Sequence, residues 1–169
     1  TMRRVMLTLA AAALVAACGC GGRGEMAEMS STEGKFRAVM YLNPRKESKQ
    51  SGQSMMYVVR NDLPDGVLSV MYADVQMKAG GTAEGRLNKA KEAEMLAANF
   101  RGGSGDKMVQ VSGHPALQAS GAQPDGKVKM RAKYCLAGSR LYVAHAMGTD
   151  SFVSSSDVDR FLDSFAITP

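Results

Sequence analysis

The feature that most constrains the fold is a strict alternation of apolar and basic residues over positions 128–136, followed by a second apolar-rich stretch. Alternation with a period of two is typical of a β-strand. Gly138 and Ser139 separate the two stretches, and glycine tolerates the positive φ that tight turns require. The sequence therefore predicts an antiparallel hairpin. Its expected pairs are Leu136 with Leu141, Tyr134 with Val143, Ala132 with His145, and Met130 with Met147.

This register also predicts which side chains share a face, because a slip of one residue would reverse every side chain. One face is expected to be core, and only His145 is polar on it, so His145 is interpreted as a core histidine bonded to a neighbour. The other face is expected to be solvated. The core face would carry Val128, Met130, Ala132, Tyr134, Leu136, Leu141, Val143, His145 and Met147. The solvated face would carry Lys127, Lys129, Arg131, Lys133, Cys135, Tyr142, Ala144 and Ala146.

The solvated face would carry a row of four basic side chains, Lys127, Lys129, Arg131 and Lys133, at intervals of about 6.6 to 7 Å. Such a row is more commonly an ordinary wet face, since long basic side chains cover a sheet while their charges stay in water. The functional alternative is a surface for an acidic partner such as lipid headgroups, an anionic glycan or an acidic protein. This row is the candidate anionic-partner surface.

The remaining periodicities predict short strands and two helices. Val158, Phe161, Leu162 and Phe165 recur at helical spacing and would dock a C-terminal helix, with Ser156 as its N-cap. Residues 45–53 are polar and are expected to form a loop. The order of elements predicts the α+β class, with helices packed on an antiparallel β-sheet. Strands are expected over 36–42, 55–60, 67–74, 108–111 and 117–120, and a long helix over 85–100.

The beginning of the chain is typical of a secretory leader. Arg3 and Arg4 precede an apolar run over residues 5–17, which is too short to span a bilayer, and Cys18 follows. Residues 14–19, Leu-Val-Ala-Ala-Cys-Gly, resemble the lipobox of bacterial lipoproteins, in which the cysteine is acylated and becomes the mature N-terminus. This resemblance implies lipidation of Cys18 and a lipid-anchored location in the cell envelope, on the periplasmic side of an outer membrane if the cell has one.

Domain organisation is expected to be simple. Residues 1–17 would be the signal peptide, and the following segment, 18–34, is rich in glycine and serine without periodicity, which predicts a flexible tether. Residues 35–169 are expected to form one α+β domain. The mildly basic composition of a chain outside the cytoplasm does not indicate nucleic acid as a partner. Cys20 and Cys135 could pair in an oxidising compartment, although their spacing lacks the density of a disulfide framework.

Four segments of the chain resemble small envelope proteins of the PsbP-like type, and the resemblance extends in element order over residues 36–167. It implies an α-β-α sandwich without a shared enzymatic activity, in a superfamily that includes photosystem extrinsic subunits, adaptor proteins and lipoproteins. The chain departs from the common Gly-x-Pro-Gly pattern, because Ala116 follows Pro115, so no role is assigned to that turn. The segments are 111–115 (Val-Ser-Gly-His-Pro), 131–134 (Arg-Ala-Lys-Tyr), 139–143 (Ser-Arg-Leu-Tyr-Val) and 159–165 (Asp-Arg-Phe-Leu-Asp-Ser-Phe).

Two classes of function follow. The first is a non-catalytic binding or adaptor module and not an enzyme, because the chain has no Gly-x-Ser-x-Gly elbow and only two histidines. The alternative is a copper-handling or redox protein, because Cys135, His114, His145 and Met147 are cupredoxin ligand types. The predicted register places Cys135 and His145 on opposite faces, so no metal site and no cofactor are expected.

Overall fold

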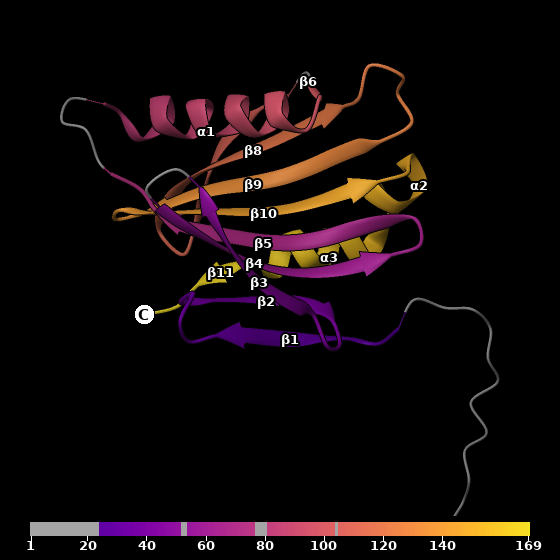
Figure 1. The fold of residues 1–169 in the computed structure, drawn as a ribbon, viewed down its shortest axis with the longest axis horizontal. Coiled ribbons are helices and arrows are strands. Elements are labelled where there is room, and N and C mark those ends of the chain that lie inside the picture. The colour runs from indigo at the N-terminus through magenta and orange to yellow at the C-terminus, as the bar shows by residue number, and fades with distance from the viewer. Residues whose placement is uncertain (1–23, 52–53, 77–80, 104) are drawn as a thin grey trace, which may run out of the picture.

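An antiparallel sheet of eight strands forms the central layer of the molecule (Figure 1). The computed structural model describes residues 24–51, 54–76, 81–103 and 105–169, so the expected signal peptide and Cys18 lie outside the described residues. The strand order is β3-β4-β5-β10-β9-β8-β6, and β7 also pairs with β8. The strands are β3 (Arg45–Ser51), β4 (Ser54–Leu63), β5 (Gly66–Asp74), β6 (Arg101–Gly102), β7 (Lys107–Val111), β8 (His114–Ala122), β9 (Lys129–Ala137) and β10 (Arg140–Gly148).

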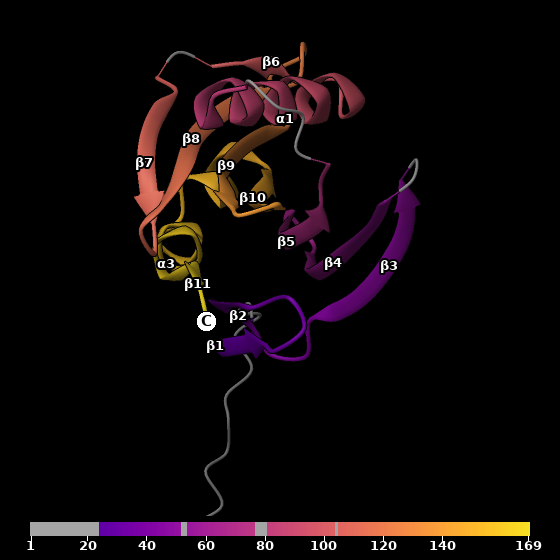
Figure 2. The ribbon, with the colours of Figure 1, turned by 90° about the vertical axis from the view of Figure 1, so that its left-hand side faces the viewer.

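Different elements pack on the two faces of this sheet (Figure 2). Helix α1 (Ala83–Ala97) packs on one face, mainly over β8 and β9. Helices α2 (Asp150–Val153) and α3 (Ser156–Ser164) lie on the other face, with a three-stranded antiparallel sheet in the order β1-β2-β11. The small sheet consists of β1 (Met26–Ser31), β2 (Phe36–Tyr41) and β11 (Ala166–Ile167). The predicted α+β class is confirmed, with helices on both faces of an antiparallel sheet. In the described part of the chain, no helix is long and apolar enough to cross a membrane.

The predicted hairpin is confirmed in register. The strands β9 and β10 pair antiparallel, and all four expected pairs occur, from Leu136 with Leu141 to Met130 with Met147. Gly138 in the turn has a φ of 60°, which lies in the left-handed region that favours glycine. The local pattern and the turn residue were therefore sufficient to fix this register.

The expectation of a solvated hairpin face is wrong. Cys135, Tyr142, Ala144 and Ala146 are between 0% and 2% exposed, because α3 and the small sheet cover them. They belong to one core with Phe36, Phe152 and Phe161, while the opposite face forms a second core beneath α1 with Leu87, Met95 and Tyr134. Both faces of the hairpin are therefore buried.

The two longer helices are close to their predicted positions. α1 begins after Thr82, whose hydroxyl accepts from the backbone N of Gly85 at 3.1 Å. The N-cap of α3 is Ser155 and not the expected Ser156, and the Ser155 hydroxyl donates to the Phe152 carbonyl at 2.7 Å instead of capping the helix. The buried positions of α3 and its end are the four that the periodicity predicted: Val158, Phe161, Leu162 and Phe165.

The segment expected to be a flexible tether contains the first strand. β1 pairs along its whole length with β2, from Met26 opposite Tyr41 to Ser31 opposite Phe36. The turn that follows is tied to β10, because Arg140 donates to the Glu33 carbonyl at 2.9 Å. The ordered domain therefore begins near residue 25 and not at residue 35, and residues 18–23 lie outside the described part.

Residues 45–51 form a strand where a loop was expected. Among the described strands, β3 pairs only with β4 and is an edge of the large sheet, which explains its sequence, Arg-Lys-Glu-Ser-Lys-Gln-Ser. Charged residues, lysine above all, are typical of edge strands because they discourage pairing with another chain. The strand has no apolar residue, so it lacks the alternation that identifies a half-buried strand.

Candidate functional site

The basic row is neutralised by the chain's own aspartates. Three of its members lie on β9, and each forms an ion pair with a residue of α2 or α3. The pairs are Lys129 Nζ with Asp150 Oδ1 (2.7 Å), Arg131 Nη1 with Asp159 Oδ1 (2.8 Å) and Lys133 Nζ with Asp163 Oδ1 (3.1 Å). Three of the four charges that the sequence offered to an acidic partner are therefore compensated within the domain.

Two of these side chains also donate to helix carbonyls. Arg131 Nη1 reaches the carbonyl of Val153 at 3.1 Å, and Lys133 Nζ reaches the carbonyl of Leu162 at 2.8 Å. Such bonds satisfy carbonyl groups near helix ends, which have no partner within the helix. Lys127 differs, because it lies before β9 in an exposed turn. The structure thus gives Lys129, Arg131 and Lys133 a role in holding helices on the sheet and does not group Lys127 with them.

Lys129 and Arg131 also border an open hollow of about 450 Å³. Arg101 of β6 lines the same hollow and is exposed. Asp150, the ion-pair partner of Lys129, is on its rim as well, so the hollow is only moderately basic. We call it the basic hollow.

A buried polar cluster lies beneath α1. His145 is 4% exposed, and its Nδ1 lies 2.6 Å from Oε1 of Glu94. Tyr134 is fully buried nearby, and burial, followed by the charge of Glu94, raises the pKa of its hydroxyl far above the ordinary value. Ser69 lies directly opposite His145 in the sheet, and its buried hydroxyl has no hydrogen-bond partner among the described residues. The prediction that His145 is a core histidine bonded to a neighbour is confirmed.

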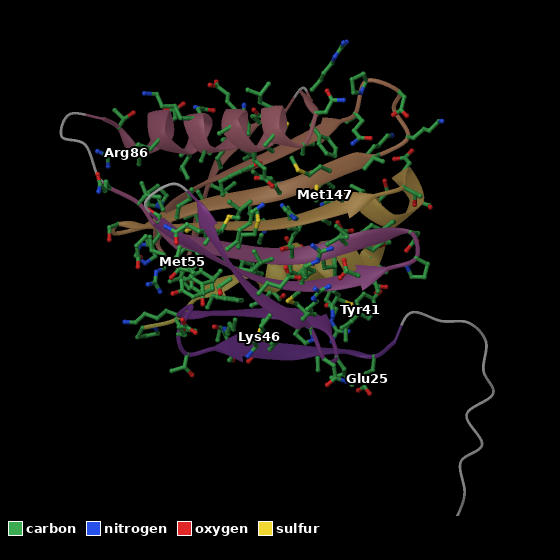
Figure 3. The ribbon with its side chains drawn as sticks, in the orientation of Figure 1. Glu25, Tyr41, Lys46, Met55, Arg86 and Met147 are labelled. Carbon is green, nitrogen blue, oxygen red and sulfur yellow. The ribbon has the colours of Figure 1, made fainter. Side chains whose placement is uncertain are left out.

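The structure does not assemble the ligands of the copper alternative. Cys135 is a free and fully buried thiol on the α3 side of the sheet, whereas His145 bonds to Glu94 of α1 and lies opposite Ala132 of the core beneath that helix. Burial raises the pKa of the Cys135 thiol to about 11, which disfavours the thiolate that binds metals. Met147, labelled in Figure 3, packs against the core beneath α1. The opposite faces predicted for Cys135 and His145 are confirmed.

A row of three neighbouring tyrosines was not predicted from the sequence. Tyr142 of β10 lies opposite Tyr72 of β5, which lies opposite Tyr57 of β4. The Tyr72 and Tyr57 rings stack at 5.0 Å with 13° between their planes, and the Tyr142 and Tyr72 rings are 6.1 Å apart. We call these three residues the tyrosine row. It runs from the middle of the sheet towards the β3 edge.

The tyrosine row ends in a hollow of about 300 Å³ between β3, β4 and the turn that joins β1 to β2. Ser48 of β3 lies directly opposite Tyr57, so only a small side chain follows the last ring in the row. We call this hollow the tyrosine slot. Figure 3 marks Lys46 on β3, where that strand lies close to the small sheet. The slot is lined by Tyr57 and Tyr72, by Val58 and Val59, by Ser30, Ser31 and Thr32, and by Glu33, Lys46 and Glu47.

The turn that forms one wall of the slot is held by hydrogen bonds from three sides. Gly34 N donates to the Ser31 hydroxyl at 3.0 Å, and the Tyr142 hydroxyl donates to the Gly34 carbonyl at 2.8 Å. Arg140, which donates to the Glu33 carbonyl, is itself fixed by two bonds to Asp74 at 2.7 and 2.8 Å. The wall is therefore preorganised by β10.

The hydroxyls of Tyr72 and Tyr142 are donors at neutral pH. Burial raises the pKa of Tyr72 above its usual value, and the charge of Glu33 adds to the effect. Burial also raises the pKa of Tyr142. The positive charge of Arg140 acts in the opposite sense and lowers the pKa of Tyr72, since its guanidinium lies 5.4 Å from the Tyr72 ring centre. The slot therefore combines aromatic surface, neutral hydroxyls and charges of both signs.

Sequence reasoning missed the slot because its parts come from distant strands. Tyr57 and Tyr72 were placed in strands correctly, but no pattern fixed the register between β4 and β5. Tyr142 was assigned to a solvated face. The one available signal was the composition of the face on which Tyr142 lies. That face carries Cys135, Ala144 and Ala146 as well as the lysines and the arginine, so it is less polar than a solvated face.

Comparison with known proteins supports the fold. No family model matches the chain, and no curated protein matches it. Among solved structures, the chain resembles the solution structure of cyanobacterial PsbP (CyanoP) from Synechocystis sp. PCC 6803, with a TM-score of 0.60. The match covers 90% of this chain and 98% of that chain at 13% sequence identity. The domain therefore has a PsbP-like fold, as the sequence resemblance implied.

Proposed function

We propose that the protein is a lipid-anchored lipoprotein of the cell envelope whose PsbP-like domain is a non-catalytic binding or adaptor module. The observation that carries this proposal is the position of the first strand. β1 begins at Met26, eight residues after the cysteine of the lipobox-like motif. The leader and the domain are thus joined by a very short connection.

The length of this connection limits where the domain can act. Eight residues span at most about 29 Å even when fully extended. A lipid on Cys18 would therefore keep the domain within about one domain diameter of the bilayer surface. Partners in reach are membrane headgroups, envelope glycans and envelope proteins. This location is the periplasmic side of the outer membrane if the cell has one.

Anchoring is tested by replacing the lipidated residue. Cys18→Ser is expected to release the protein from the membrane fraction and to abolish labelling by a fatty-acid probe. Cys20→Ser is a matched control, since it removes the neighbouring thiol and leaves the lipobox-like motif intact. Both variants are compared by fractionation and by intact mass. A Cys18→Ser protein that still carries the probe would refute the anchor.

A second, finer proposal concerns an acidic partner at the basic hollow. Lys129 and Arg131 are paired, but Arg101 and Lys127 are exposed close to that end of β9. Binding to anionic vesicles through exposed charges should weaken with salt, as the Debye length falls from about 10 Å at 0.1 M to about 3 Å at 1 M.

The test reverses the exposed charges and leaves the ion pairs in place. Arg101→Glu with Lys127→Glu should reduce binding to anionic vesicles in 0.1 M salt. Lys49→Glu with Lys107→Glu is the matched control, because it makes the same change of net charge at exposed positions elsewhere. Equal loss in both double variants would indicate attraction by net charge alone and would remove the basic hollow as the binding surface.

A further inference from the structure

We propose that the tyrosine slot binds a sugar ring, of the hexopyranose type found in envelope glycans, with the outer face of Tyr57 as its platform. This inference rests on the proposed role as a binding module and assigns a ligand class to it.

The platform is the last ring of the tyrosine row. One face of Tyr57 is stacked on Tyr72 at 5.0 Å. Its neighbour on the other side is Ser48, an exposed residue whose side chain is too small to cover an aromatic ring. An aromatic face carries partial negative charge, and the axial C–H groups of a pyranose ring carry partial positive charge, so the two surfaces attract each other. Tyr57 is also only half-buried, which leaves the ring accessible.

The polar lining matches the hydroxyl groups of a sugar. Each sugar hydroxyl both donates and accepts, so a sugar site needs donors and acceptors close together. Lys46 supplies donors, Glu33 supplies acceptors, and the hydroxyls of Ser30 and Thr32 supply both. The hollow of about 300 Å³ is at the lower end of the range typical of small-molecule sites, which suits one or two rings.

The same lining disfavours other ligand classes. An apolar chain would cover Lys46 and the serine and threonine hydroxyls without satisfying them, which costs free energy. A phosphate or other anion would face the carboxylate of Glu33, whereas the Glu47 carboxylate pairs with Arg45 on the other face of β3. A neutral polyol on an aromatic surface meets neither penalty, so the lining selects it.

One wall of the slot is held in place before any ligand binds. The turn that contributes Ser30 to Glu33 is fixed by Arg140 and Tyr142 through the carbonyls of Glu33 and Gly34. Because this wall is already ordered, ligand binding costs less conformational entropy. This matters for a sugar, because hydrogen bonds to sugar hydroxyls replace bonds to water and give little net gain each.

The test is a titration of the full chain in a detergent without a sugar headgroup, followed by ¹H–¹⁵N chemical shifts. The probes are N,N′-diacetylchitobiose and maltose, which distinguish an acetamido sugar from a plain hexose. Shifts are expected at residues 30–33, 46–48 and 57–59 for at least one probe, with a Kd on the order of 1 mM, typical of a ligand with few heavy atoms.

Two variants at one exposed position separate ring stacking from folding. Ser48→Arg should place a guanidinium over the outer face of Tyr57 and weaken binding about tenfold or more. Ser48→Ala keeps that face open and should bind as the wild type does. The unliganded spectra of both variants report whether the fold is intact. Because position 48 is exposed on an edge strand, neither change removes a core contact.

The outcomes are distinct from those of the anchoring test. Absence of shifts at the slot with both sugars, or equal binding by Ser48→Arg and wild type, would overturn the sugar site even if Cys18→Ser releases the protein from the membrane. Binding at the slot that Ser48→Arg abolishes would support the sugar site even if anchoring at Cys18 failed. The binding is measured in detergent, so it does not depend on the lipid.

Discussion

The two faces of the eight-stranded sheet hold their ionisable side chains in different ways. On the α3 side, Lys129, Arg131 and Lys133 lie around an apolar core, and each meets an aspartate that is more than half exposed. On the α1 side, the pair of Glu94 and His145 lies beneath the helix, with side chains only 16% and 5% exposed. One face has charges at its rim, and the other has a polar pair inside its core.

This difference predicts different sources of stability. Exposed ion pairs contribute little each, typically below about 1 kcal/mol, because water screens them. The α3 face must therefore depend on its large aromatic core. A buried pair is costly to break, since the remaining group loses both its partner and water. The α1 face should therefore be sensitive to single polar changes. Four experiments, in decreasing order of expected effect, test this comparison.

The largest effect is expected from the core of the α3 face. Phe161 is fully buried between α3 and the sheet, and Phe161→Ala should lower the free energy of unfolding by about 3–5 kcal/mol, because it leaves a cavity. Urea unfolding followed by circular dichroism measures the change. Arg160→Ala, on the exposed side of the same helix, is the control and should change stability by less than about 0.5 kcal/mol. A loss of less than about 1 kcal/mol for Phe161→Ala would contradict the importance of this core.

The polar pair of the α1 face should give the next largest effect. His145→Leu leaves the Glu94 carboxylate partly buried without its partner and should cost about 2–3 kcal/mol. Glu94→Leu combined with His145→Leu should cost less than the sum of the single changes, because neither partner is left behind. Additive single and double variants would show that the two side chains do not stabilise each other.

Reversing charges on the α3 rim should have a smaller effect. Lys129→Glu with Arg131→Glu turns two attractions into repulsions and should cost about 1–2 kcal/mol in 0.1 M salt. Adding Asp150→Lys and Asp159→Arg restores opposite charges and should recover most of the loss. The reversal is expected to affect the fold as well as the surface charge, because these cations hold α2 and α3 on the sheet. Unchanged stability in the double variant would mean that the rim pairs contribute nothing.

The smallest effect is expected from acid titration of Asp74. Hydrogen bonds from Arg140 lower the pKa of Asp74 below its usual 3.8. A depressed folded-state pKa contributes stability that is present above the unfolded pKa and is lost as the pH falls through the folded value. Asp74→Asn should therefore flatten the stability profile below about pH 4, by less than about 1 kcal/mol, because the carboxylate is 64% exposed. If the variant and the wild type lose stability equally as the pH falls, the contribution of the Asp74 carboxylate is excluded.

Local patterns predicted the parts of the fold that depend on neighbouring residues. The β9–β10 hairpin needs only a glycine turn and alternation on both sides, so its register followed from residues 128–147. The C-terminal helix likewise carries its own apolar stripe. These elements contain, within about twenty residues, the information that specifies them.

The parts that were missed depend on residues far away in the chain. β1 is ordered by pairing with β2, and β3 by pairing with β4, although neither has an apolar alternation of its own. The face of Cys135 and Tyr142 is buried because α3 and the small sheet cover it, which no local pattern shows. The tyrosine slot was missed for the same reason, since Tyr142, Tyr72 and Tyr57 meet only after three strands align.

The small sheet has a consequence for the timing of folding. β2 lies between β1 and β11, and its Val39 N donates to the Ser164 hydroxyl at 2.7 Å, across 125 positions of sequence. During synthesis, β1 and β2 emerge first and form a two-stranded hairpin, which is marginally stable in water. They become locked only when residues 164–167 have been made. The first part of the domain in sequence is therefore among the last to be secured, and its apolar side chains and strand edges stay exposed for that interval.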